Sequence, residues 1–296
     1  MPPVKIEINQ DCNGCGVCVK ICPARAFTAI AEKAVLSGSC TFSCDHCAAA
    51  CPQQAITTDL FEAEPFNFSS FSEDPSARPI PLPELIKLMR SRRSCRLYQD
   101  KAVSREILTD LVKAAITAPS GTNSQKWTFS IIDNREGVIR FGSEIAAYYR
   151  RVNRLAERKW LRKILKICGR PELDRYYEEY YESISEGLDL WYKSQEDRLF
   201  HGAGSVILVG ARPGASCPRE DALLATQNII LAAESMNLGT CLIGFAVEAL
   251  HRDHKIQAAL KIPATETIYS VIALGRPEVT FKRPAKRRRI TVNWIS

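Results

Sequence analysis

Eight of the twelve cysteines of this 296-residue chain lie between residues 12 and 51. They form two runs with nearly the same spacing. The first run begins at Cys12 with the spacing C-x2-C-x2-C-x3-C-P, and the second begins at Cys40 and has one extra residue in its first gap. Gaps this short let one looping backbone present three thiols to a single site, while the fourth thiol, which precedes a proline, turns away from them. A segment of this kind must fold around whatever its thiols bind.

This spacing is the one found in bacterial ferredoxins, where each run gives three ligands to one [4Fe–4S] cluster and the fourth to the other. We therefore predict two [4Fe–4S] clusters with crossed ligand sets. The alternative is structural zinc, because paired C-x2-C units also bind that ion, but two triplets that each precede x3-C-P fit cubane clusters better. Gly14 and Gly16 relieve crowding where the backbone approaches sulfur. The predicted ligands are Cys12, Cys15, Cys18 and Cys51 for one cluster, and Cys22, Cys40, Cys44 and Cys47 for the other.

Cysteine usage and charge restrict the class of protein further. In a reducing compartment such a group of cysteines favours metal binding over disulfides. No secretory signal and no apolar run near the about 20 residues of a membrane helix is visible, so we expect a cytoplasmic protein without a membrane partner. The net charge of +7 divides into −3 for residues 1–64 and +10 for the remainder. The basic remainder lacks zinc-finger histidines and RNA-binding aromatic motifs, and we expect no nucleic-acid partner.

The pattern of apolar residues predicts two domains and a linker. Residues 1–63 form the cysteine-rich domain, residues 64–81 are rich in Pro, Ser and Phe and indicate a linker, and residues 82–296 form a larger domain. Helical spacing and caps predict helices, and short apolar runs predict strands. The predicted helices of the larger domain are 104–119, with Ser104 as N-cap, and 219–239; the predicted strands are 127–133, 204–211, 240–245 and 267–275.

The larger domain contains an insertion at about residues 143–200 and a basic C-terminal arm at 281–296. Residues 144–169 predict one basic amphipathic helix, and residues 171–198 are acidic and aromatic. One interpretation is a helical hairpin that covers the domain, with its two charge signs complementing each other. The other is a lid over a pocket. The candidate lining residues of such a lid are Tyr176, Tyr177, Tyr180, Tyr181 and Trp191.

Three polar stretches of the larger domain stand out. They are "RSRRSCRLY" at 90–98, "APSGTNSQKW" at 118–127 and "KRPAKRRRI" at 282–290. No G-x-G-x-x-G follows a strand, so no Rossmann site for NAD or FAD is visible. Each stretch alone is typical of a solvated face or a turn. Together they resemble the nitroreductase family of FMN-dependent oxidoreductases over residues 82–290, with Lys126 in place of the family's usual proline.

This resemblance implies an α+β fold with a central, mostly antiparallel sheet flanked by helices, FMN as cofactor, and two flavin sites at the interface of a homodimer. It implies that the first stretch and the C-terminal arm bind the flavin phosphate, ribityl chain or ring edge. It also implies that the second stretch reaches the flavin of the other subunit, and that backbone N–H groups near residue 243 face flavin N5. The implied contacts are Arg92, Arg93, Ser94, Arg96, Pro119, Ser120, Asn123, Gln125, Ile243, Gly244, Lys286 and Arg288.

The two parts together predict an iron–sulfur flavoprotein of an anaerobic organism. Electrons from a low-potential donor such as ferredoxin would pass through the clusters to FMN, which would reduce a small acceptor, namely a nitroaromatic, a quinone or an activated alkene. Two alternatives stay open. One is other FMN chemistry on the same fold, such as dehalogenation or flavin breakdown, and the other is a non-catalytic electron-transfer or redox-sensing module. The sequence indicates no catalytic side chain.

Overall fold

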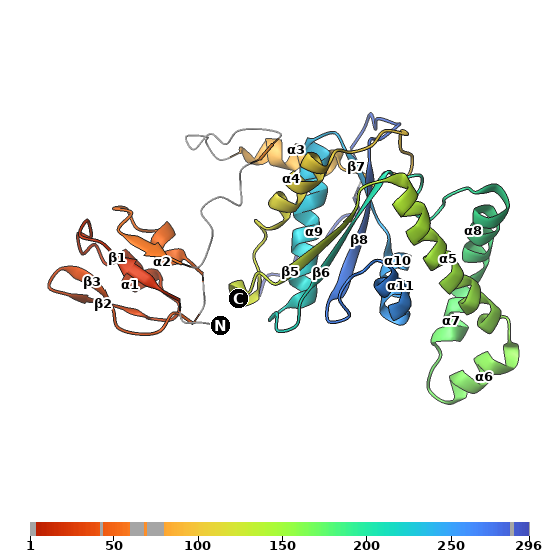
Figure 1. The fold of residues 1–296 in the computed structure, drawn as a ribbon, viewed down its shortest axis with the longest axis horizontal. Coiled ribbons are helices and arrows are strands. Elements are labelled where there is room, and N and C mark those ends of the chain that lie inside the picture. Colours follow the sequence, from red (N-terminus) through yellow and green to blue (C-terminus); the bar gives the residue numbers. More distant parts are fainter. Residues whose placement is uncertain (1–3, 42–43, 60–67, 70–79, 285–286, 296) are drawn as a thin grey trace. The chain divides into compact units, whose positions relative to one another are not determined.

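The computed structural model describes residues 4–41, 44–59, 68–69, 80–284 and 287–295 (Figure 1). The chain divides into two compact units, and each is described by itself. The smaller unit comprises Met1–Asn67 together with Pro119–Gln125 and Gly214–Cys217, and the rest of the chain forms the larger unit. Most of the predicted linker lies outside the described residues. No helix among the described residues is long and apolar enough to cross a membrane.

The smaller unit has two short antiparallel pairs of strands and two short helices. β1 pairs with β4, and β2 with β3. The small core contains Phe27 and Ile56 but also the thiols of Cys18 and Cys47, so part of what holds this unit together is sulfur rather than hydrocarbon. Its elements are β1 (Ile6–Ile8), α1 (Val17–Ile21), β2 (Phe27–Ile30), β3 (Lys33–Leu36), α2 (His46–Ala49) and β4 (Ile56–Thr58).

The larger unit is built on one antiparallel sheet with the strand order β5-β6-β8-β7. A short parallel bridge between Ser94 and Thr240 adds the chain around residue 94 beside β7. The α+β fold and the antiparallel sheet expected from the sequence are confirmed. The strands are β5 (Trp127–Ile132), β6 (Ser205–Ala211), β7 (Gly239–Leu242) and β8 (Thr267–Gly275).

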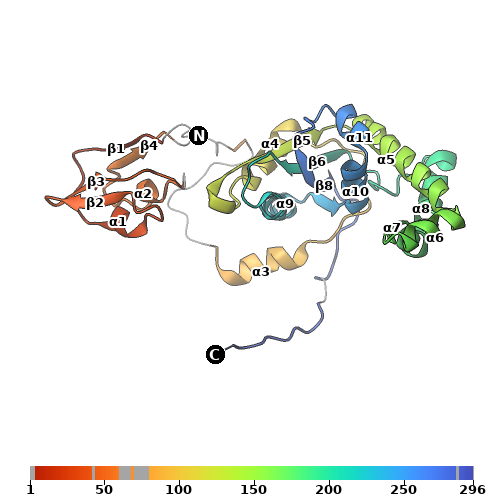
Figure 2. The same ribbon diagram turned by 90° about the horizontal axis from the view of Figure 1, so that it is seen from below.

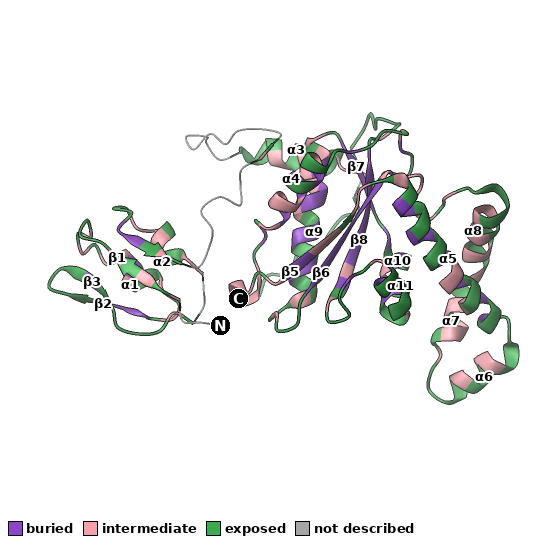
Figure 3. Ribbon diagram, in the orientation of Figure 1, coloured by how far each residue is buried: buried purple, intermediate pink, exposed green. Residues whose placement is uncertain are grey.

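Helices cover both faces of this sheet (Figures 1 and 2). Successive strand side chains point to opposite faces. Leu208 on β6 therefore packs in the core formed with α5, α10 and α11, while its neighbour Ile207 packs in the core formed with α4 and α9. The sheet is consequently buried on both sides (Figure 3). The helices are α3 (Leu82–Ser91), α4 (Arg105–Ala115), α5 (Arg135–Ala156), α9 (Pro218–Ser235), α10 (Gly244–Arg252) and α11 (His254–Ala259).

The insertion differs from the single helix predicted at 144–169. The chain forms α5, which begins earlier at Arg135, and a separate helix α6 (Lys159–Ile167), because Arg158 has an extended backbone. The break lets α6 turn toward α7 (Glu172–Glu179), where Asp174 forms ion pairs with Arg162 at 3.1 Å and Lys166 at 2.7 Å. The charge complementarity expected within the insertion is therefore present. α8 (Tyr181–Ser194) completes the insertion and packs on α5 (Figure 1).

The strand predicted at 240–245 is also only partly right. β7 ends at Leu242, and Gly244 begins α10. The apolar run predicted as one strand therefore belongs to two elements. Its first half pairs with β8, and its second half begins a helix. This strand-to-helix turn lies at one end of the sheet, where the chain from the insertion returns.

That returning chain is fixed by one buried carboxylate. Asp197, whose side chain is 3% exposed, accepts hydrogen bonds from the backbone N–H groups of Phe200 at 2.7 Å and Leu199 at 3.1 Å. Its other oxygen accepts from Nη1 of Arg135 at 2.7 Å. The helix that starts at Arg135 is thereby tied to the segment 197–202 that leads into β6.

We predict that Asp197→Asn lowers the free energy of unfolding by about 2 kcal/mol, because the amide cannot replace the charge that faces Arg135 in a partly buried site. Urea unfolding followed by circular dichroism measures the change. Asp189→Asn is the matched control, because Asp189 is 64% exposed and pairs only with Lys193 on the same helix. That substitution should cost less than about 0.5 kcal/mol. Equal losses of unfolding free energy in the two variants would contradict the role of Asp197 in fixing this segment.

Candidate functional site

The eight clustered thiols surround two separate hollows of the smaller unit. Each hollow is lined by three cysteines from one run and by the last cysteine of the other run. Among the described residues, no three His, Cys, Asp or Glu side chains converge closely enough to hold one metal ion. A cubane cluster is held by four thiolates, and each hollow is lined by four thiols. One hollow is lined by Cys12, Cys15, Cys18 and Cys51, and the other by Cys22, Cys40, Cys44 and Cys47.

The two runs repeat their backbone geometry as well as their spacing. The N–H of Ala26 donates to Sγ of Cys22 at 3.4 Å, and the N–H of Ala55 donates to Sγ of Cys51 at 3.3 Å. The residue that precedes each short helix has a left-handed backbone conformation. It is Gly16 before α1 and Asp45 before α2. The hydrogen bonds from backbone N–H groups to sulfur stabilise the thiolate, which is the form in which cysteine binds iron.

The thiols differ in how readily they lose a proton. A hydrogen bond from the N–H of Ala34 lowers the pKa of Cys12. Burial instead raises the pKa of Cys47 to about 11 and also raises the pKa of Cys18. The two buried thiols therefore need a cationic partner to exist as thiolates near neutral pH, and coordination to iron supplies one. The residues fit the predicted clusters.

In the larger unit, a hollow of about 400 Å³ opens where β7 turns into α10. It brings together three of the predicted flavin contacts, Arg96, Ile243 and Gly244, from segments far apart in the sequence. The remaining lining residues are Arg198, Leu199, His201, Cys241, Leu242 and Phe245.

The arginines of the first motif divide between two places. The backbone N–H of Cys95 donates to the carbonyl of Thr240 at 2.9 Å, which holds this segment beside β7. Both Arg92 and Arg96 lie near the buried thiol of Cys241 and oppose the rise that burial causes in its pKa. Ser94, in the same segment, is exposed. The predicted cationic group is therefore present around the hollow.

Arg93 faces the C-terminal arm instead. Its guanidinium lies 5.2 Å from the ring centre of Phe281 and donates to the carbonyl of Arg283 at 3.5 Å. Its Nε is buried and has no hydrogen-bond partner among the described residues. A buried cationic N–H of this kind suits an anionic ligand. Further along the arm, Arg288 is exposed, and Lys286 lies outside the described residues.

The turn into α10 supplies one free backbone donor rather than two. The N–H of Ile243 donates to the carbonyl of Val271 at 2.8 Å and so belongs to the sheet. The expectation that a backbone N–H near residue 243 faces flavin N5 therefore falls to Gly244, and the contact itself stays a prediction. Gly244 is the first residue of α10, and the first N–H groups of a helix have no acceptor within it. The positive end of the helix dipole adds to this preference for a negative group.

His201 and Cys241 were missed by the sequence analysis. Burial and the neighbouring Arg96 lower the pKa of His201, so its imidazole is neutral near pH 7. His201 also has a left-handed backbone with φ 57°, which is uncommon for a residue with a side chain. No sequence motif marks it, because only the fold carries the segment after Asp197 to the end of β7.

The second motif forms a compact loop of its own. Thr122, Asn123 and Gln125 all have left-handed backbones, with φ between 47° and 52°. The hydroxyl of Ser120 accepts from the N–H of Gln125 at 3.0 Å, and the Thr122 and Ser216 hydroxyls are 2.7 Å apart. Strained residues gather at functional sites more often than elsewhere. Contacts of Pro119, Ser120, Asn123 and Gln125 with a flavin of a second subunit stay a prediction.

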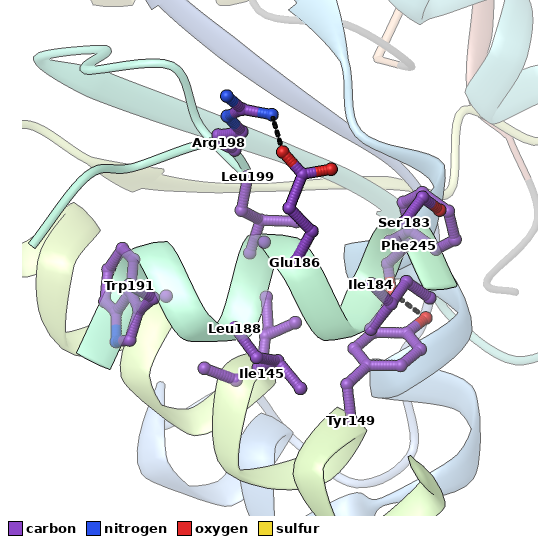
Figure 4. A pocket seen from close by; sticks show the side chains of 13 residues that line it. Ile145, Tyr149, Ser183, Ile184, Glu186, Leu188, Trp191, Arg198, Leu199 and Phe245 are labelled. Atoms are coloured by element: carbon purple, nitrogen blue, oxygen red, sulfur yellow. Dashed lines mark hydrogen bonds and ion pairs between the residues drawn. The ribbon is translucent and has the colours of Figure 1, made fainter. Parts of the chain in front are cut away.

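A second cavity, of about 310 Å³, lies between α5 and α8 (Figure 4). We call it the chamber. Trp191 lines it, as predicted. The four candidate tyrosines are not among its lining residues. Tyr177 instead stacks on Arg162 at 3.7 Å, and the hydroxyl of Tyr176 donates to Asn153, because α7 packs on α5 and α6.

Two family models match the sequence. The model of the nitroreductase family matches residues 89–276, and a model of a 4Fe–4S binding domain matches residues 6–28. The second match covers the first run of cysteines. The nitroreductase match includes the four predicted contacts of the first motif and the turn into α10.

Curated relatives and solved structures are similar to most of the chain. A 4-nitrobenzoate reductase of Nocardioides sp. is 29% identical over 225 residues, which cover 70% of this chain and 87% of that protein. An iodotyrosine deiodinase of Danio rerio is 24% identical over 204 residues, 68% of this chain and 63% of that protein. The crystal structure of a nitroreductase with bound FMN from Desulfitobacterium hafniense has a TM-score of 0.51 at 24% identity and covers 72% of this chain and 98% of that one. It shows that the fold is shared.

Proposed function

Because the chain belongs to the nitroreductase family and carries an N-terminal 4Fe–4S binding domain, we propose that it is an FMN-dependent oxidoreductase whose electrons enter through two [4Fe–4S] clusters. The observation that carries the proposal is that each half of the chain forms its own site. Two sets of four thiols surround two hollows, and the predicted flavin contacts Arg96 and Gly244 meet in a third.

The residues around the third hollow suit FMN. The guanidinium groups of Arg92 and Arg96 would hold its phosphate or ring edge. The buried Nε of Arg93, which faces the C-terminal arm, offers a donor for an anion on that side. The N–H of Gly244, at the positive end of α10, would stabilise negative charge that develops on the reduced ring. The flavin, when bound, supplies two-electron transfer to a small acceptor. The strained loop at 119–125 supports a homodimer in which each subunit completes the site of the other.

The direction of electron flow follows from what can enter each half. The larger domain contains no G-x-G-x-x-G nucleotide motif, so we propose that single electrons enter through the clusters. We propose a reduced ferredoxin or a similar low-potential carrier as donor, and a nitroaromatic, quinone or activated alkene as acceptor. The relationship to an iodotyrosine deiodinase supports reductive dehalogenation as the second candidate function.

The crossed ligand sets lead to a prediction that uses pairs of substitutions. The protein isolated without oxygen should contain about eight irons per chain. Cys12→Ser with Cys51→Ser removes two ligands of the same cluster and should leave about four irons. Cys12→Ser with Cys22→Ser damages both clusters and should leave almost none. Cys168→Ser, at an exposed thiol, is the control. Iron analysis measures the content of each variant. If the first pair left almost no iron and the second left about four, each run would hold its own cluster.

The arginine assignment leads to a second prediction. Arg92→Ala or Arg96→Ala should weaken FMN retention by about tenfold or more, because a charge-assisted contact to phosphate is worth about 1.5–3 kcal/mol. Iron content should not change. Arg140→Ala, at an exposed position on α5, is the control. Flavin released on denaturation and the equilibrium constant for FMN rebinding measure the effect. Unchanged retention in both variants would refute the assignment at this motif.

The proposed relay leads to a third prediction. In the full-length chain, the variant with Cys12→Ser and Cys22→Ser should keep its FMN but lose rapid flavin reduction by reduced ferredoxin. Stopped-flow absorbance without oxygen measures the rate, with NADH and NADPH as alternative donors and Cys168→Ser as control. Equal ferredoxin rates with and without the clusters would refute the relay. Fast reduction by NAD(P)H alone would show that the clusters are accessory.

A further inference from the structure

The chamber between α5 and α8 is a site that the flavin chemistry does not itself require. Its walls are mainly apolar: Ile145 and Tyr149 come from α5, and Ile184, Leu188 and Trp191 come from α8 (Figure 4). α5 can approach Trp191 because it carries a glycine there. A Cβ atom at Gly142 would lie 2.7 Å from the indole ring. The chamber is thus shaped by close packing of two helices around an open interior.

The few polar groups that line the chamber are already engaged. The hydroxyl of Tyr149 donates to the backbone carbonyl of Phe245 at 2.9 Å, and burial raises the pKa of this tyrosine, so it stays neutral. Arg198 is the cation at the rim. Its Nη1 lies 3.0 Å from Glu186 (Figure 4). Its Nε lies 3.0 Å from Glu196. Two carboxylates for one guanidinium leave the rim with a net negative charge.

The chamber adjoins the hollow at the end of β7. Arg198, Leu199 and Phe245 line both cavities. Phe245 directly follows Gly244, whose N–H is the proposed flavin donor. A molecule that occupies the chamber and extends past these three residues therefore brings one end to the flavin site.

We propose that the chamber binds the body of the electron acceptor and selects a neutral, apolar aromatic molecule over an anionic one; this rests on the proposed function. Apolar walls favour a ligand that loses little hydration on entry. A carboxylate would lose its hydration without gaining a free cation, and it would meet the excess negative charge of Glu186 and Glu196. The chain should therefore differ in acceptor from its 4-nitrobenzoate reductase relative, whose named substrate carries a carboxylate.

A pair of nitroaromatics that differ in one charge tests this. The probes are methyl 4-nitrobenzoate and 4-nitrobenzoate, which carry the nitro group in the same place. Two electrons from the reduced flavin and two protons from water convert either nitro group to a nitroso group and one water. In the full-length holoprotein, reduced without oxygen, the ester should react with at least tenfold higher kcat/KM. An equal or higher value for the carboxylate would overturn the proposal.

A substitution that narrows the chamber locates the binding site. Gly187 lines it, and a Cβ atom there would meet no other atom within 4 Å, so Gly187→Leu adds bulk without displacing the backbone. This variant should raise the Kd of methyl 4-nitrobenzoate for the oxidised holoprotein at least tenfold in equilibrium dialysis, and it should lower kcat/KM in proportion. Glu182→Leu places the same side chain at an exposed position of α8 and should change neither value. Unchanged Kd in Gly187→Leu would refute the chamber as the site.

A second variant tests the charge argument while keeping the size of the substituted side chains nearly the same. Glu186→Gln with Glu196→Gln frees Arg198 from both carboxylates. It should raise the ratio of kcat/KM for 4-nitrobenzoate to kcat/KM for the ester several-fold. An unchanged ratio of the two values would refute selection by charge at the rim.

Ferricyanide separates this proposal from the proposed function, because it accepts electrons without entering an apolar cavity. Flavin oxidation by ferricyanide should be the same in all variants. If the reduced holoprotein transfers electrons to neither nitroaromatic but still binds the ester in the chamber, the proposed function fails and the binding site stands. If it reduces the ester at wild-type rate in Gly187→Leu, the binding site fails and the function stands.

Discussion

The antiparallel pairing of β6 and β8 is the constraint on which the larger unit depends. Every residue of β6 is buried, so helices must cover both faces of the sheet. α4 and α9 cover one face, and α5, α10 and α11 cover the other. The connections between strands and helices therefore meet at the ends of the strands, and the hollow forms there, where β7 passes into α10. The site is a consequence of how the sheet is covered.

Electrostatics at this end of the sheet depends on keeping positive and negative groups apart. Arg92, Arg96 and the start of α10 supply positive potential to the hollow. Asp197 lies in the same segment as His201, but its charge is taken up by Arg135 and by three backbone N–H groups. The carboxylate thus shapes the wall of the site without cancelling the positive charge that an anionic ligand needs.

The sequence predicted those sites whose residues lie close together along the chain, and it missed those that only folding brings together. The spacing from Cys12 to Cys51 identified both thiol sets, because short loops leave the chain few ways to present sulfur, and the two hollows have those sets. Arg96 came from a quoted stretch and Gly244 from the resemblance, and both line the hollow, whereas their contact with a flavin stays a prediction. His201 could not be found, since only folding brings it to them. The expected helix at 144–169 failed for a similar reason: its pairing with Asp174 depends on α7, which periodicity cannot show.

The division between core and insertion separates chemistry from acceptor choice. The proposed flavin contacts of the hollow lie at the sheet, next to fully buried residues such as Ala246 and Phe200. The walls of the chamber come partly from α8, which like α6 and α7 has no buried residue (Figure 3). Elements with little buried surface open locally at low cost and tolerate substitution. Substitutions in the insertion can therefore change which acceptors enter the proposed site and leave the sheet and the proposed flavin contacts intact.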